Sequence, residues 1–131
     1  MPYPPTANTM YPTGRDGKRH LSKAGRQYRK TVYGEVLEQL GIFKPFKDPL
    51  FVTIGLYLPD KRKRDIDNVI KAVFDALVYS SVLIDDDQVV GLTAYKLPSF
   101  KPGSCMVSIQ QAQAWYTTQG YSSLEDAYLA A

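Results

Sequence analysis

The chain has 131 residues, a length that fits one domain and buries a core without disulfide staples. Hydrophobic residues make up 44% of it, which argues against global disorder, and the single cysteine, Cys105, excludes an intrachain disulfide. The net charge is only +3, no apolar run approaches the roughly 20 residues that span a bilayer, and the first residues lack a secretory signal, so we expect a cytoplasmic protein.

The first 40 residues predict an arm followed by a helix. Residues 1–20 are rich in Pro, Tyr, Thr and Gly, which favours an extended arm. Ser22 can cap a helix from about Lys23 to Leu40, and Gly41 is a natural stop. The apolar stripe of this helix recurs at every fourth position: Tyr28, Val32, Val36 and Leu40.

The middle of the chain predicts a strand, a charged link and a second helix. Apolar side chains alternate over residues 50–58, as in a strand, and Pro59 ends the run. Residues 60–66 are charged and predict an extended link. A helix follows from about Asn68 to Val78, with Asp67 as its expected N-cap.

The last third predicts two more strands and a tail. Residues 88–97 and 104–111 are expected to pair as an antiparallel hairpin around the turn at 98–103. The order of elements predicts a single α+β domain over residues 1–113, with a small mixed sheet and two main helices. Residues 114–131 predict a short helical tail.

Charged residues are segregated along the sequence. One basic stretch contains Arg15, Lys18, Arg19, Lys23, Arg26, Arg29 and Lys30, and a second comprises Lys61, Arg62, Lys63 and Arg64. The acids gather elsewhere, around Asp65–Asp67 and Asp85–Asp87. This pattern favours a phosphate-binding surface around an acidic site, although two solvated basic faces would give the same composition.

Several kinds of active site are excluded by residue types. No Gly-rich loop precedes a Lys-Ser or Lys-Thr pair, so there is no P-loop. His20 and Cys105 are each unique, which excludes a zinc site built from His and Cys. A catalytic triad would have to use His20, which lies in the polar arm.

The carboxylates can instead hold a divalent cation. Asp65 and Asp67 would point to the same side of an extended link, and the Asp85–Asp87 run would supply a third carboxylate. Three hard oxygen ligands suit Mg²⁺ or Mn²⁺, which can activate water for phosphodiester cleavage. The alternative interpretation is that both acidic loops simply face water.

Three residues near these acids complete the candidate site. Lys71 lies four residues after Asp67 on the same helix face, where it could hold a phosphate or merely form a surface ion pair. Asn68 could cap the helix or orient a ligand. We interpret Asp75, further along the helix, as ordinary surface.

Three separate runs of the sequence resemble the RusA family of Holliday junction resolvases. The runs are Pro59-Asp60-Lys61-Arg62-Lys63-Arg64-Asp65-Ile66-Asp67-Asn68, Lys71-Ala72 with Phe74-Asp75-Ala76-Leu77, and Ile84-Asp85-Asp86-Asp87-Gln88-Val89-Val90. The arm is similar too, through Pro4-Pro5-Thr6-Ala7-Asn8, Leu21-Ser22-Lys23-Ala24-Gly25 and Tyr28-Arg29. The resemblance covers roughly residues 3–110.

The resemblance implies a function and roles for particular residues. The family consists of homodimeric, Mg²⁺-dependent nucleases of bacteria, phages and prophages that cut two strands of a four-way DNA junction symmetrically. By position, Asp65, Asp67 and Asp86 correspond to the metal-binding and catalytic aspartates, and Lys71 to an essential lysine. Spacing favours Asp86 as the third ligand, but Asp85 or Asp87 remains an alternative.

Partners and alternatives follow from the same comparison. We expect a homodimer, contacts between four-way junction DNA and the two basic stretches, and substitution of Mn²⁺ for Mg²⁺. Two other functions stay open: a non-catalytic branched-DNA-binding protein and a nuclease for other branched DNA. Family members usually begin with a strand ahead of the Pro-Pro segment, where this chain starts, so sheet composition and dimer geometry are expected to differ.

Overall fold

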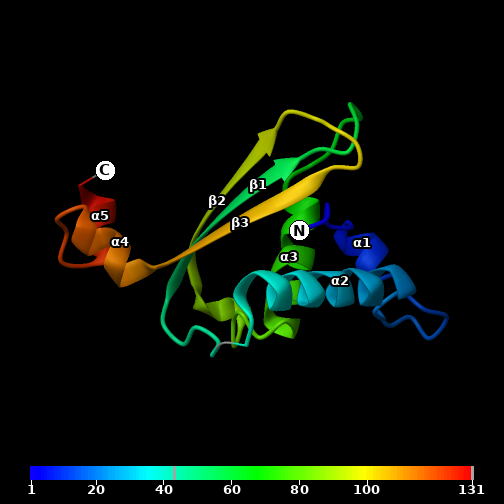
Figure 1. Ribbon diagram of the computed structural model, residues 1–131, viewed down its shortest axis with the longest axis horizontal. Coiled ribbons are helices and arrows are strands. Elements are labelled where there is room, and N and C mark those ends of the chain that lie inside the picture. Colours follow the sequence, from blue (N-terminus) through cyan, green and yellow to red (C-terminus); the bar gives the residue numbers. More distant parts are fainter. Residues whose placement is uncertain (43, 131) are drawn as a thin grey trace.

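The fold is organised around one apolar strand in the middle of a three-stranded sheet. The structure is a computed structural model that describes residues 1–42 and 44–130. Strand β1 (Leu50–Tyr57) lies between β2 (Val89–Leu97), which runs parallel to it, and β3 (Ser104–Gln111), which runs antiparallel (Figure 1). The sheet is therefore small and mixed, as predicted.

The predicted hairpin between the last two strands is wrong, because β1 separates them. The connection at residues 98–103 crosses the end of β1, where the Phe100 N–H donates to the Leu58 carbonyl at 2.9 Å. The sequence of β1 explains this order: it has no charged residue and buries alternate side chains, whereas β2 carries Lys96 and suits an edge.

Two long helices cover one face of this sheet (Figure 1). Helix α2 (Lys23–Leu40) starts at Ser22, whose hydroxyl accepts from the Gly25 N–H, and ends at Gly41 with a φ of 67°, so both predicted boundaries are confirmed. Helix α3 (Asp67–Tyr79) packs its apolar stripe on β1. The core between them includes Val52 and Ile54 from β1 and Val69, Val73 and Leu77 from α3.

Helix α3 begins differently from the prediction. Ile66, not Asp67, occupies the N-cap position, and it is already helical, with φ −60° and ψ −47°. Its side chain packs against the core, which fixes that conformation. The predicted N-cap and the fully extended link are therefore wrong, and this difference determines where Asp65 and Asp67 point.

The remaining helices are short. The arm is not wholly extended, because it contains α1 (Ala7–Met10), whose Met10 is fully buried against α2. A 3₁₀ turn, η1 (Asp86–Gln88), precedes β2. Helices α4 (Ala112–Thr118) and α5 (Leu124–Leu129) lie beyond one end of the sheet. None of the helices formed by residues 1–42 and 44–130 combines the length and apolar character of a membrane span.

Candidate functional site

The acidic turn before β2 is held in shape by its own side chains. Asp85 caps η1 by accepting the Asp87 N–H at 3.1 Å. The Gln88 side-chain oxygen, Oε1, accepts the Asp85 N–H at 3.0 Å and the Ile84 N–H at 2.7 Å. The Gln88 amide also donates to the Phe46 carbonyl at 2.7 Å. The turn is therefore a capping box tied to the segment before β1.

This turn faces the arm and α3 across an open cavity of about 610 Å³. The polar groups that line the cavity are Tyr11, Arg19, Lys71, Asp75, Asp85 and Asp86. Lys71 extends from α3, and its charge acts on Asp86 by lowering the carboxyl pKa. The fold thus brings together a predicted lysine and a predicted aspartate from separate elements.

The two adjacent carboxyls in the cavity perturb one another. A hydrogen bond with Asp85, followed by partial burial and the Asp85 charge, raises the pKa of Asp86 above its ordinary value despite Lys71. The Asp87 N–H, and then the hydrogen bond with Asp86, lower the pKa of Asp85. The two adjacent carboxyls therefore influence one another's protonation, and a divalent cation would offset their mutual repulsion.

The other predicted carboxylates lie outside this cavity. Asp65 and Asp67 are exposed, and so is Asn68. Because Ile66 is helical, residues 65 and 67 diverge instead of sharing one side. Within the described residues, no three His, Cys, Asp or Glu side chains converge as a metal site. The oxygen donors suit Mg²⁺ in kind, but the three-carboxylate cage is not assembled.

The basic residues divide into anchored and outward-facing groups. Arg64 bonds to Asp60 at 2.9 Å and stacks over the Tyr3 ring. Arg19 donates to the Tyr11 carbonyl at 2.8 Å, and Arg26 donates to the Leu21 carbonyl at 2.9 Å.

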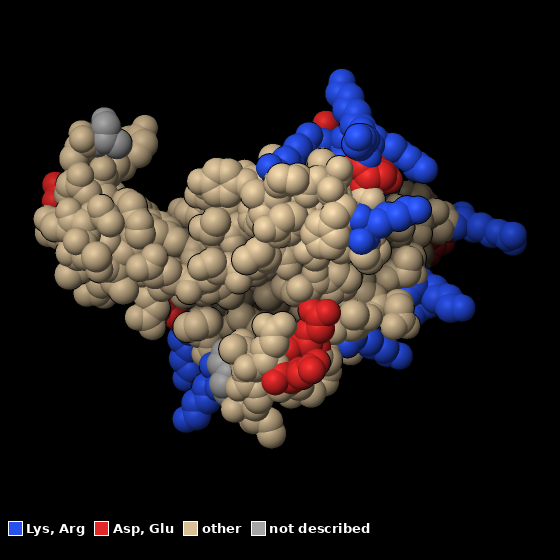
Figure 2. Space-filling model, turned by 45° about the horizontal axis from the view of Figure 1, so that its top comes forward, with Lys and Arg blue, Asp and Glu red and all other residues tan. Residues whose placement is uncertain are grey.

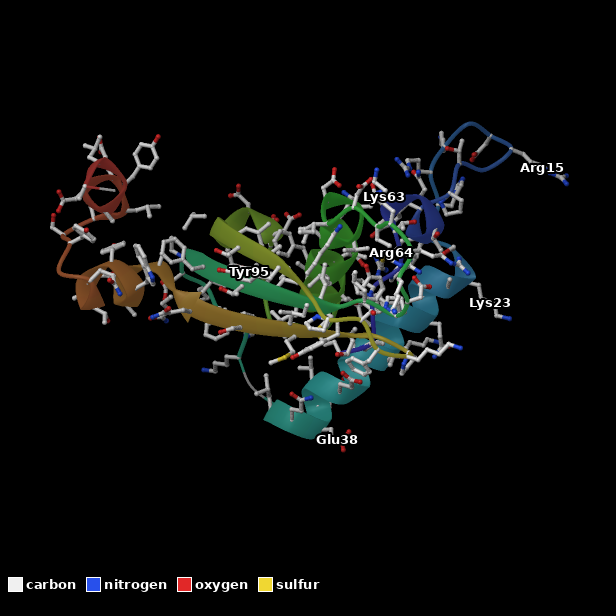
Figure 3. All side chains as sticks on the ribbon, turned by 90° about the horizontal axis from the view of Figure 1, so that it is seen from above. Arg15, Lys23, Glu38, Lys63, Arg64 and Tyr95 are labelled. Carbon is white, nitrogen blue, oxygen red and sulfur yellow. The ribbon has the colours of Figure 1, made fainter. Side chains whose placement is uncertain are left out.

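The outward-facing group comprises Arg15, Lys18, Lys23, Lys61, Arg62 and Lys63, all exposed. Figure 3 shows Arg15 and Lys23 projecting away from the fold. Basic side chains crowd the end of the molecule opposite the tail (Figure 2). That end contains the β1–α3 connection and the arm, and of these two the arm lines the cavity, through Ala7, Tyr11 and Arg19.

The interpretation of Asp75 as ordinary surface is wrong. Its carboxylate accepts two hydrogen bonds from Arg29, at 2.6 Å and 2.8 Å, and one from the Tyr11 hydroxyl. Burial alone would raise the Asp75 pKa, but these bonds outweigh it and hold the pKa below its usual range. A sequence signal existed: Asp75 follows Lys71 by one helical turn and lies between the apolar positions Phe74 and Ala76.

Comparison with known proteins identifies the class and then the family. Residues 2–110 match the family model described as endodeoxyribonuclease RusA, so the chain is of the endodeoxyribonuclease class. The chain belongs to the RusA family, and the predicted resemblance is confirmed.

Two curated relatives show how close the relationship is. The crossover junction endodeoxyribonuclease of Enterobacteria phage 82 is 36% identical over 115 residues, covering 85% of this chain and 91% of the relative. The crossover junction endodeoxyribonuclease of Escherichia coli strain K12 is 35% identical over 114 residues, with the same coverage. The family-model match at residues 2–110 stops before α4.

Proposed function

We propose that this chain is a Mg²⁺-dependent Holliday junction resolvase, which cuts four-way DNA junctions by paired symmetric nicks in recombination and repair. The observation that carries the proposal is the cavity that joins Asp86 to Lys71 inside a chain of the RusA family. The relatives named above come from a phage and a bacterium, which agrees with a phage or prophage origin.

We assign the cation to Asp86 together with Asp65 and Asp67, with Asp85 as the alternative ligand beside Asp86. A bound Mg²⁺ would supply a more acidic water and stabilise charge on the scissile phosphate, and Mn²⁺ would substitute. The Asp85–Asp86 pair favours this assignment, because the two adjacent carboxyls perturb one another's pKa and a cation would offset their negative charge. Ligation by all three carboxylates requires the Asp65 and Asp67 side chains to turn towards the cavity that Asp86 lines.

The chain's own side chains have separate tasks in this proposal. Lys71 holds a phosphate oxygen at the cavity, where a fixed positive charge stabilises charge that builds up during cleavage. The exposed basic residues at the arm and before α3 contact the DNA backbone, which gives affinity with little sequence information. Asn68, beside Asp67, supports the orientation of that carboxylate.

A homodimer would present two such sites to the two strands of one junction. The sheet face opposite α2 and α3 is the surface we assign to the second copy. Tyr95 and Met106 flank Gly55 on that face and are 55% and 59% exposed. Figure 2 shows an uncharged surface between the tail and the basic end, and such a surface can meet itself without like-charge repulsion.

Cleavage of synthetic substrates tests the activity. With Mg²⁺, four-way junctions should be nicked in both strands, and more readily than flaps or plain duplexes. Asp67→Asn should abolish cutting and leave junction binding intact, whereas Glu38→Gln, an exposed acid on α2, should change neither. Light scattering of the wild type should give the mass of a dimer. Wild-type protein that binds junctions but never nicks them would contradict the proposal.

A further inference from the structure

A half-buried ion pair lies next to Lys71. Arg29 on α2 and Asp75 on α3 are joined by two hydrogen bonds, and their side chains are only 25% and 20% exposed. The Tyr11 hydroxyl donates to the same carboxylate. Arg29 therefore occupies both Asp75 oxygens, and Tyr11 adds a second donor to one of them.

Lys71 is the second cation whose charge acts on that carboxylate. It precedes Asp75 by four residues, the spacing at which helical side chains meet, and its charge already acts on Asp75. Nevertheless, Lys71 forms no ion pair with any residue in the part of the chain that is described. Its ammonium lies 5.9 Å from the centre of the Tyr11 ring and lines the cavity with Asp86.

We propose that Arg29 is a positioning residue: by neutralising Asp75, it prevents that carboxylate from capturing Lys71 and leaves the lysine available to DNA phosphate. This inference rests on the proposed function, in which Lys71 contacts the phosphate. Arg29 suits the task because its guanidinium binds both carboxylate oxygens in a fixed geometry. Without Arg29, the partly buried Asp75 carboxylate would have Lys71, one turn earlier on the same helix, as the cation placed to pair with it.

A double-mutant cycle separates this role from a structural one. Arg29→Met should lower the single-turnover cutting rate about tenfold or more, with little change in junction affinity, because Asp75 then holds Lys71. Adding Asp75→Asn removes the competing charge and should restore most of the rate. Lys47→Met removes a positive charge from an exposed position outside both basic stretches and should cut like wild type.

A second measurement does not depend on cutting. Amine-reactive labelling of Lys71, followed by mass spectrometry, should slow in Arg29→Met and recover in the double variant, with thermal melting confirming that each variant folds. If wild type cuts junctions but the double variant is no better than Arg29→Met in rate or labelling, the inference is wrong. If wild type does not cut junctions, the proposed function fails, whereas the labelling result still decides whether Arg29 protects Lys71.

Discussion

The two acidic segments of the candidate site are built in opposite ways. In the turn at residues 84–88, backbone and side-chain hydrogen bonds from Asp85 and Gln88 fix the geometry before any ligand arrives. In the segment at residues 65–67, both carboxylates are exposed, and only Ile66 is anchored, through its packing on the core. One segment is preorganised and the other is not.

Electrostatics accounts for this difference. Three carboxylates that converged without a cation would repel one another, and this repulsion would lower the stability of the fold. The chain tolerates one close pair, Asp85–Asp86, because the turn supplies N–H donors and Lys71 supplies positive charge. Asp65 and Asp67 diverge around the helical Ile66, so their carboxylates do not add to that repulsion.

Among substitutions in the acidic turn, the largest effect is expected at Asp86. Asp86→Asn should lower the cutting rate by about 100-fold or more, because it removes a charged oxygen that the cavity places beside Lys71. Single-turnover assays with labelled junctions at saturating Mg²⁺ measure the effect. Junction affinity should be unchanged or slightly higher, since one negative charge is lost.

Asp87→Asn is the matched control for that substitution. It changes the same charge one position away, but Asp87 contributes its backbone N–H to the cap and its side chain is not among the groups lining the cavity. Cutting should stay within a few-fold of wild type. A larger loss in Asp87→Asn than in Asp86→Asn would show that the third ligand is displaced by one residue.

An intermediate effect is expected at Gln88, whose side chain holds the acidic turn by hydrogen bonds. Gln88→Ala removes the acceptor for two N–H groups and the donor to Phe46, so the acidic turn loses its preorganisation. The Mg²⁺ concentration that gives half-maximal cutting should rise about tenfold, while the rate at saturating Mg²⁺ recovers. Gln110→Ala, on the exposed surface of β3, should leave the Mg²⁺ dependence unaltered. An unchanged Mg²⁺ dependence in Gln88→Ala would contradict preorganisation.

Sequence patterns predicted the elements more successfully than their arrangement. The period of Tyr28 and Val32, with caps at Ser22 and Gly41, located α2 to the residue because those signals are local. Strand order is not local, so nothing in residues 88–111 revealed that β1 would lie between the last two strands. The helical conformation of Ile66 also depends on a core contact formed only after folding.

For the candidate site, too, the residues could be predicted from the sequence but the contacts between separate elements could not. Family resemblance identified Asp86 and Lys71, which the fold brings to one cavity. The pairing of Asp75 with Arg29 joins residues 46 positions apart, and the apolar neighbours of Asp75 in the sequence do not reveal which residue of another helix it meets. Ion pairs between elements require knowledge of which helix faces meet, and periodicity alone does not supply it.

The smallest expected effect is a pH dependence confined to the acidic turn. NMR titration of the cation-free protein should show the Asp86 carboxyl titrating above its ordinary pKa and the Asp85 carboxyl below it, in two coupled steps. A raised folded-state pKa means that the Asp86 contribution to stability is present at low pH and is lost as the pH rises through that pKa. The lowered pKa of Asp85 acts in the opposite sense, because its contribution to stability is present above the unfolded-state pKa and is lost as the pH falls through the folded-state pKa.

Two changes test the link between the two carboxyls. Asp85→Asn should return the pKa of Asp86 towards its ordinary value, and added Mg²⁺ should lower the Asp86 pKa in the wild type. If Mg²⁺ left the Asp86 titration unmoved while still supporting cleavage, the cation would have to bind through the other segment, and the contrast between the two acidic segments would be reversed.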